Sequence, residues 1–375
     1  MNRTKDSQTT SRRDFLKVAG AATVGTGLIA PGSLLAADEA VTKSTVAVVQ
    51  NTSVSDAVRS AVTLSGGLDF IQPGQRVLIK TCAFNQQAHP CANSPELLYA
   101  VIRLVADAGC TDIYVGDRSF FVIKDVMSVL KAVGQYDAAM QAKQDIGGGV
   151  NVTVTPLDDA APYLKEGSEP WRTIVHPQAK HYVDEQGRNT GFQLAEILFQ
   201  MDHVINLSVA KTHFQAWFTM AMKSFVGMSS GQTRLAFHKF ATTNDLGRQR
   251  ELGQAEIQPD VTPFTNRLVE LNLGLEPRLN IIEGTQPMVS GGPVDGDTIK
   301  ADVVIASRDR IAADVAGIAL LRTLGTDKRL QTISPWQNPM IKYARKIGIG
   351  VKYPEQLTLK HEGLRDLQAF RANMA

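Results

Sequence analysis

The sequence RVLIKTCAFNQQAHPCANSPELLYAVIRLVADAGCTDIYV, at residues 76–115, has the pattern of a strand, a helix and a second strand in succession. The two strands are RVLI at Arg76–Ile79 and DIYV at Asp112–Val115, both rich in β-branched residues. Between them, Ser94 and Pro95 are followed by an acidic residue, a pattern typical of a capped helix N-terminus. This order predicts a parallel β-α-β unit.

The same alternation continues on both sides of this unit. We therefore expect an α/β fold with a mostly parallel open sheet and helices on both faces. Residues 147–192 and 229–260 are irregular in pattern, and we expect them to form a lid or subdomain. The other expected elements are Thr45–Val49, a helix over Val54–Leu64 capped by Ser53 or Ser55, His203–Leu207, a helix around Trp217–Phe225, Leu279–Ile282, Asp302–Ile305 and a helix over Asp309–Leu324.

The N-terminus carries the sequence SRRDFLKVAGAATVGTGLIAPGSLLAA at residues 11–37. Arg12 and Arg13 precede a weakly apolar run of small residues, which is typical of a twin-arginine export signal. The run is too short for a membrane span, and we expect none in the mature chain. We expect residues 1–37 to be removed after passage through the twin-arginine translocation machinery, leaving residues 38–375 as a single periplasmic domain. The alternative is an ordinary basic N-terminus followed by a short helix.

The charge balance argues against one class of partner. The chain holds 39 Lys and Arg residues and 37 Asp and Glu residues. The first 37 residues include five basic and two acidic ones, so the remainder carries a net charge of −1. Neither a basic stripe nor a basic patch interleaved with aromatic residues is present, and we expect no nucleic-acid binding.

The three cysteines and His89 raise the possibilities of a disulfide and of a metal site. No C-x-x-C-x-x-C run occurs, so we expect no iron–sulfur cluster held by the protein. Cys82, His89 and Cys91 lie within ten residues and are a ligand set suited to zinc or copper. We favour instead a Cys82–Cys91 disulfide, because an exported protein meets an oxidising compartment. Cys110 follows a predicted helix and fits a buried apolar position.

Several junctions between strands and helices carry distinctive motifs. They are IQPGQRVLIK at residues 71–80, NSPELLYAVIRLVADAG at 93–109, YVGD at 114–117, VINLSVAKTH at 204–213, AMKSFVG at 221–227, LNIIEGTQPMVSGGPVDG at 279–296, VVIASRDRIAADVAG at 303–317 and NPMIKYARKIGIG at 338–350. In this order they resemble a bacterial and archaeal family called domain of unknown function three hundred and sixty-two. The resemblance implies an α/β fold, here without the ferredoxin-like cluster domain of some members, and it implies no reaction.

The chain departs from the family pattern at two places. A Lys-Pro-Asn commonly follows the second strand in the family, where this chain has Lys80, Thr81 and Cys82. A Lys-Asn is common after the K-T-H motif, where this chain has Lys223 and Ser224. If those asparagines bind a ligand in the family, this chain binds it differently or binds another one.

Polar residues follow several of the expected strands. In an open parallel sheet, ligands gather beyond the carboxyl ends of the strands. Lysines there would attract a phosphate or carboxylate, and a histidine could transfer protons. The alternative is that each residue is a solvated charge or a helix cap. We expect catalysis from His213 and Lys211, and binding of a ligand or cofactor by Lys80, Asp117, Thr212, Lys223, Gly227 and Glu283.

These observations predict an exported protein that binds a small anionic ligand or cofactor at the sheet edge, with or without its conversion. Two alternatives belong to other classes. One is a non-catalytic protein that binds a ligand or metal during maturation. The other is an accessory subunit with an exported redox partner.

Overall fold

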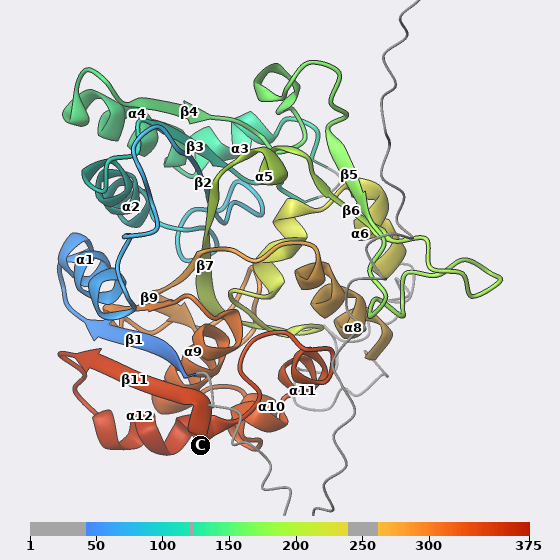
Figure 1. The fold of residues 1–375 in the computed structure, drawn as a ribbon. Coiled ribbons are helices and arrows are strands. Elements are labelled where there is room, and N and C mark those ends of the chain that lie inside the picture. Colours follow the sequence, from blue (N-terminus) through green and yellow to red (C-terminus); the bar gives the residue numbers. More distant parts are fainter. Residues whose placement is uncertain (1–42, 121–122, 239–261) are drawn as a thin grey trace, which may run out of the picture. The chain divides into compact units, whose positions relative to one another are not determined.

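The computed structural model of the protein describes residues 43–120, 123–238 and 262–375. Its central feature is a nine-stranded sheet (Figure 1). The strand order is β11-β1-β10-β9-β7-β2-β3-β4, and β8 pairs with β7. A separate two-stranded sheet pairs β5 with β6. The strands are β1 (Ser44–Gln50), β2 (Arg76–Lys80), β3 (Asp112–Gly116), β4 (Asn151–Val154), β5 (Trp171–Ile174), β6 (Phe192–Ala195), β7 (His203–His213), β8 (Trp217–Thr219), β9 (Leu279–Met288), β10 (Val303–Ser307) and β11 (Leu357–Glu362).

Most strands of the large sheet run in one direction. Only β10, which is antiparallel to both β1 and β9, and β8, which is antiparallel to β7, run against the others. The pairs β11-β1, β9-β7, β7-β2, β2-β3 and β3-β4 are all parallel. The expectation of a mostly parallel sheet is therefore confirmed, and the carboxyl ends of β2, β3, β4 and β7 meet at one edge.

Two cores cover the two faces of the sheet. Along β2, Val77 and Ile79 join the core that holds residues of α1 to α4, whereas Leu78 joins the core that holds residues of α5, α8, α9, α11 and α12. This alternation is what a strand buried on both faces requires. The helices are α1 (Val54–Leu64), α2 (Pro95–Asp107), α3 (Val126–Ala132), α4 (Gln135–Ile146), α5 (Ile197–Gln200), α6 (Gly231–His238), α8 (Thr262–Glu270), α9 (Arg310–Leu324), α10 (Lys328–Gln331), α11 (Pro339–Lys346) and α12 (Leu367–Met374).

Short 3₁₀ helices complete the described chain. They are η1 (Ala161–Tyr163), η2 (Lys223–Met228), η3 (Leu271–Leu273), η4 (Pro335–Gln337) and η5 (Pro354–Gln356). Within the described ranges, no helix is both long enough and apolar enough to cross a membrane.

Side-chain caps place the predicted helices correctly. Ser53 accepts the N–H of Asp56 at the start of α1, and Ser94 accepts the N–H of Leu97 at the start of α2. Asp309 likewise caps α9. Each cap satisfies backbone donors that a helix start leaves without partners.

The predicted helix around Trp217–Phe225 is wrong. Strand β7 continues six residues beyond the predicted end. The chain then turns, and Trp217, the first residue of β8, pairs with His213, the last residue of β7. Trp217 adopts a positive φ of 69°, which a helix does not allow. Backbone pairing with the end of β7 therefore decides the structure of this stretch, and only η2 beyond it is helical.

The two stretches expected to be irregular differ in outcome. Residues 147–192 contain β4, η1 and β5, so this region holds more regular structure than its composition indicates. Strand β4 extends the main sheet as its last strand. Of residues 229–260, only the part up to residue 238, mainly α6, is described, and the rest of the predicted lid lies outside the described residues. The predicted export signal also lies outside them.

Candidate functional site

Three lysines lie near one another at the carboxyl edge of the parallel strands, and we call them the lysine cluster. Lys80 is the last residue of β2, Lys211 lies near the end of β7, and Lys223 begins η2. By strand alternation, Lys80 shares the face of Leu78 and Lys211 shares the face of Leu207. The charges of both Lys211 and Lys80 act on Lys223, so the cluster joins residues from opposite faces of the sheet.

Lys80 is neutralised by the protein itself. Its Nζ lies 3.3 Å from Oδ1 of Asp117, and both side chains are at least 96% buried, with exposures of 2% and 4%. Lys80 Nζ also donates to Ser224 Oγ at 2.5 Å. The other carboxylate oxygen of Asp117 accepts the N–H of Ala83 at 2.7 Å. A β-carbon at Gly227 would overlap Asp117, so only glycine fits against this ion pair.

Lys211 has a different kind of partner. Its Nζ donates to the main-chain oxygen of Cys91 at 2.7 Å, and only 1% of the residue is exposed. No carboxylate lies within ion-pair distance of Lys211 in the part of the chain that the structure describes. A carbonyl dipole compensates a buried ammonium group less completely than a carboxylate does.

Lys223 Nζ has neither a carboxylate nor a main-chain carbonyl as its partner among residues 43–120, 123–238 and 262–375. It remains partly open to solvent although protein atoms surround it on most sides. Burial and the positive charge of Lys211 lower the pKa of Lys223 to about 7. The protonation of Lys223 therefore changes near neutral pH.

The backbone that leads into Lys223 is held by three buried side chains. Asp314, in α9, accepts the N–H groups of Ala221 at 2.7 Å and Met222 at 3.1 Å. The carbonyl of Ala221 accepts from Asn206, and the carbonyl of Met222 accepts from Asn272. Burial raises the pKa of Asp314 to about 7, against the opposing effect of the two amides.

None of these three supporting residues was predicted from the sequence. A usable signal existed for one of them, because Asp314 is the only charged residue within the apolar run IAADVAGIALL of α9. A carboxylate inside a buried helix needs donors, and here the donors are backbone amides. Asn206 lies in strand β7 and Asn272 in the 3₁₀ helix η3, and neither carries a comparable signal.

His213 uses one ring nitrogen to hold the turn that follows β7. Its Nδ1 accepts the N–H groups of Gln215 and Ala216, both at 3.1 Å. The neutral ring therefore carries its proton on Nε2. Arg329 donates to the carbonyl oxygens of His213 and Phe214, each at 2.8 Å, and fixes the same turn from outside. Thr212 points to the other face, and its buried Oγ1 has no hydrogen-bond partner among the described residues.

Glu283 is engaged by the protein rather than left open to a ligand. It lies fully buried in β9, and its Oε2 accepts from Ser94 N–H at 2.9 Å and from Asn93 Nδ2 at 3.1 Å. Its Oε1 accepts from Thr285 at 3.2 Å, and His89 Nε2 lies 3.4 Å away. These contacts tie the N-terminus of α2 to the sheet, where a carboxylate is favourable.

The cysteines are free thiols in the structure. Cys82 Sγ lies 4.0 Å from the main-chain oxygen of Cys91, whereas Cys91 Sγ donates to the main-chain oxygen of Val294 at 3.1 Å. The expected Cys82–Cys91 disulfide is therefore not formed. Cys110 is fully buried in the core beside α2, as expected for an apolar position.

The residues of the alternative metal site do not come together either. His89 is directed toward Glu283 and Thr285, away from the thiols of Cys82 and Cys91. Over the described ranges, no three His, Cys, Asp or Glu side chains are grouped so that they could hold a metal ion. The loop contributes its backbone to the lysine cluster instead, through the carbonyl that binds Lys211.

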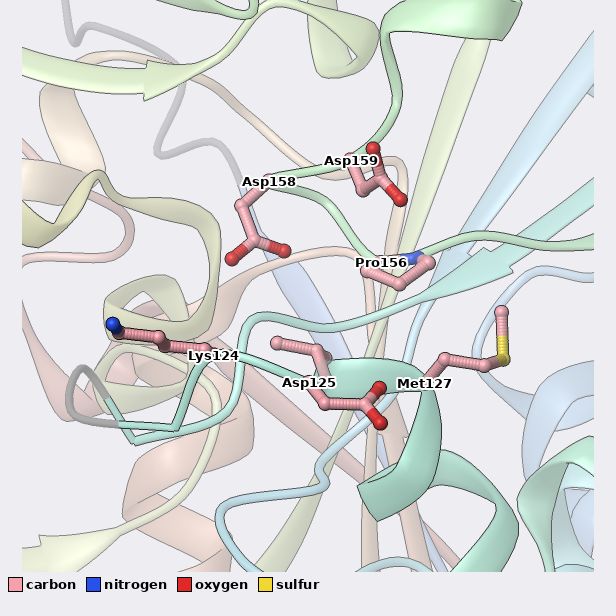
Figure 2. A pocket seen from close by; sticks show the side chains of 7 residues that line it. Lys124, Asp125, Met127, Pro156, Asp158 and Asp159 are labelled. Carbon is pink, nitrogen blue, oxygen red and sulfur yellow. The ribbon is translucent and has the colours of Figure 1, made fainter.

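A hollow of about 270 Å³ opens at the carboxyl ends of β3 and β4 (Figure 2). Three carboxylates line it, and one of them, Asp158, forms an ion pair with Arg118 at 2.9 Å. Carboxylates repel anions, so this hollow is not the predicted anion site. Its lining residues are Lys124, Asp125, Val126, Met127, Pro156, Asp158 and Asp159.

Part of the chain is similar to a known family of proteins. Residues 164–319 match the family model described as domain of unknown function (DUF362). A thylakoid-associated protein of Synechocystis sp. is 25% identical over 260 residues, which are 68% of this chain and 66% of that protein. The chain thus spans slightly less than two thirds of that relative.

Two solved structures are similar to the chain over 68% of its length, each at 12% identity. One is a protein from Thermotoga maritima, with a TM-score of 0.40 and 54% of that chain covered. The other is the lactate racemase apoprotein from Thermoanaerobacterium thermosaccharolyticum, with a TM-score of 0.39 and 53% covered. The chain spans about half the length of each.

The matched segment contains much of the described site. Lys211, His213, Lys223, Glu283 and Asp314 all lie within residues 164–319. The family expected from the sequence motifs is therefore the one whose model matches residues 164–319, which are less than half of the chain.

Proposed function

We propose that the lysine cluster binds a small anion, a carboxylate or phosphate compound, at the carboxyl edge of the sheet. The observation that carries this proposal is the charge imbalance around Lys223. Lys80 is paired with Asp117, but Lys211 and Lys223 act on each other as like charges, and neither has a carboxylate partner among the described residues. A bound anion would relieve both the desolvation and the repulsion.

Neighbouring groups can complete such a site. The hydroxyls of Thr81 and Thr212 are buried without partners within the described ranges and can donate hydrogen bonds to an anion. His213 lies two residues after Lys211 on β7, and the proposal keeps for it the catalytic role expected from the sequence.

The location of this activity belongs to the same proposal. The twin-arginine pattern at residues 11–37 supports export of the folded protein to the periplasm through the twin-arginine translocation machinery. Residues 38–375 would then be the working domain, and the ligand a small acidic compound present outside the cytoplasm.

Isothermal titration calorimetry measures the binding of sulfate and of succinate to the protein. Neither ion changes charge between pH 7 and pH 9, so any pH dependence belongs to the protein. We expect sulfate affinity to fall about tenfold from pH 7 to pH 9 as Lys223 loses its proton. Lys223→Met should abolish this dependence and weaken binding at pH 7.

Lys342→Met is the matched control, because Lys342 is an exposed lysine on α11, far along the chain from the cluster. It should bind sulfate as the unchanged protein does. Equal sulfate binding by the Lys223→Met and Lys342→Met variants would overturn the proposal, because binding would then reflect general surface charge.

A further inference from the structure

We infer that Lys223 is a nucleophilic amine that forms an imine with the carbonyl group of a small oxo acid held by the lysine cluster. This inference rests on the proposed anion site and adds to it a ligand class and a covalent step. An oxo acid carries both an electrophilic carbonyl carbon and an anionic group. Lys223 would react with the carbonyl carbon, and Lys211 would bind the anionic group.

The first step of the argument is that only Lys223 has an available amine. A lysine attacks a carbonyl through the lone pair of its neutral amine. Lys80 Nζ is already bound to Asp117 and Ser224. Lys211 Nζ donates to the carbonyl of Cys91. Lys223 has no hydrogen-bond or ion-pair partner in the described part of the chain, and it keeps contact with solvent.

The second step is that the surroundings favour the neutral amine. Burial and the positive charges of Lys211 and Lys80 all disfavour a third ammonium group. With a pKa of about 7, about half of the Lys223 side chains are neutral at pH 7. An ordinary lysine is neutral in only about one molecule in a few thousand at that pH.

The third step is that the same neighbours select the substrate. Lys211 acts on Lys223 and has no carboxylate partner among the described residues, so it can bind the acid group of a ligand. A carboxylate or phosphate held there would place an attached carbonyl next to the Lys223 amine. A neutral aldehyde or ketone would lack this anchoring interaction.

The chemistry needs no oxidant or reductant. The neutral Nζ attacks the carbonyl carbon, a C–N bond forms, and the carbonyl electron pair moves to oxygen, which takes a proton. The resulting carbinolamine loses its hydroxyl group as water after a second proton transfer, and the nitrogen lone pair forms the C=N bond. One carbonyl compound, one amine and one proton thus give one protonated imine and one water.

The turn that presents Lys223 is suited to this role because it is fixed. Asp314, Asn206 and Asn272 hold the backbone of residues 221 and 222 through four hydrogen bonds. Lys223 is the next residue, so the start of its side chain is held in place before a ligand arrives. The flexible part is then limited to the side chain itself.

The experiment traps the imine in the full-length protein. The protein is incubated with glyoxylate or pyruvate and sodium cyanoborohydride, and the adducts are located by mass spectrometry of proteolytic peptides. We expect a stable adduct concentrated at Lys223 and a trapping rate that rises through a midpoint near pH 7. Lys223→Arg keeps the positive charge and should form no adduct at residue 223, and Lys342→Met should be labelled as the unchanged protein is.

Adducts spread over exposed lysines such as Lys342 at the rate seen at Lys223 would overturn the inference. Peptide mapping of the unchanged protein decides this by itself, so the result does not depend on whether a variant folds. If sulfate binds in a Lys223-dependent manner but no adduct forms, the anion site stands and the covalent step fails. If sulfate binding also fails, both proposals fail together.

Discussion

Gly227 lies so close to Asp117 that a β-carbon at residue 227 would overlap the Oδ1 atom of that carboxylate. The same β-carbon would lie 2.8 Å from Lys80 Nζ. The 3₁₀ segment η2 therefore lies directly against the ion pair, and a larger residue at 227 would have to displace it.

Replacing this glycine tests whether the close contact matters for stability. We expect Gly227→Ala to lower the free energy of unfolding by about 1–3 kcal/mol, because the added methyl must displace a buried ion pair. Urea denaturation followed by circular dichroism measures the change. Gly148→Ala is the control, since a β-carbon there meets no atom within 4 Å. Equal losses in the two variants would show that the contact at residue 227 is unimportant.

Asp314 should make stability depend on pH. Its pKa is raised to about 7 in the folded protein from a usual value of 3.8, so the folded state binds this proton more tightly than the unfolded state. The resulting stabilisation is full below about pH 4 and is lost as the pH rises to about 7, by at most about 1.4 kcal/mol per unit.

The Asp314→Asn variant isolates this effect, because asparagine does not titrate. We expect the unchanged protein to lose stability relative to Asp314→Asn between pH 5 and pH 7, with a constant difference above that range. Urea denaturation at several pH values provides the comparison. A constant difference across the whole range would mean that Asp314 does not titrate there.

Lys211 should control the reactivity of Lys223. Lys211→Gln removes the charge while keeping a donor for the Cys91 carbonyl, so the pKa of Lys223 should rise. The pH dependence of Lys223 labelling by an amine-reactive reagent, located by peptide mapping, reports this shift. An increase of one unit, from about 7 to about 8, lowers the neutral fraction at pH 7 from about one half to about one in eleven, so labelling slows about fivefold. An unchanged midpoint in Lys211→Gln would remove Lys211 from the explanation.

The three thiols should be protected by burial. Cys82 is 8% exposed, Cys91 is 7% exposed and Cys110 is fully buried. Burial also raises the pKa values of Cys91 and Cys110, which lowers their thiolate content. We expect Ellman's reagent to detect three thiols only after unfolding in guanidinium. Detection of a single thiol in the unfolded protein would instead indicate that the Cys82–Cys91 disulfide forms in the isolated protein.

The export proposal predicts a clear cellular result. Arg12→Lys together with Arg13→Lys should keep the protein in the cytoplasm, because the translocation machinery recognises the paired arginines. Cell fractionation and immunoblotting measure the distribution. Arg3→Lys is a matched control outside the pair and should leave export intact. Periplasmic protein at unchanged levels in the double variant would argue for another route.

Local signals predicted the helices well and the end of β7 poorly. The cap at Ser94 and the proline after it lie next to each other in sequence, so the start of α2 could be located without knowledge of the fold. Trp217 of β8, by contrast, pairs with His213 of β7, and this pairing depends on how the chain turns after β7. The sequence around Trp217 has helical periodicity, but backbone pairing prevails.

The candidate site shows the same division. Strand ends predicted that Lys80, Asp117 and Lys211 would gather at one edge, and the structure places them there. The sequence could not show that Glu283 accepts hydrogen bonds from the start of α2, because the donors Asn93 and Ser94 lie about 190 residues from it along the chain. It also could not show that Asp314 supports the backbone before Lys223, because that contact depends on the packing of α9.

The antiparallel strand β10 has a consequence for biosynthesis. Strand β1 begins at residue 44, yet its two neighbours in the sheet, β10 and β11, begin at residues 303 and 357. A ribosome must therefore make more than 250 residues after β1 before either edge of that strand can pair. Until then β1 has neither of its two neighbours in the sheet. Completion of the sheet is therefore a late event, which follows the synthesis of β10 and β11.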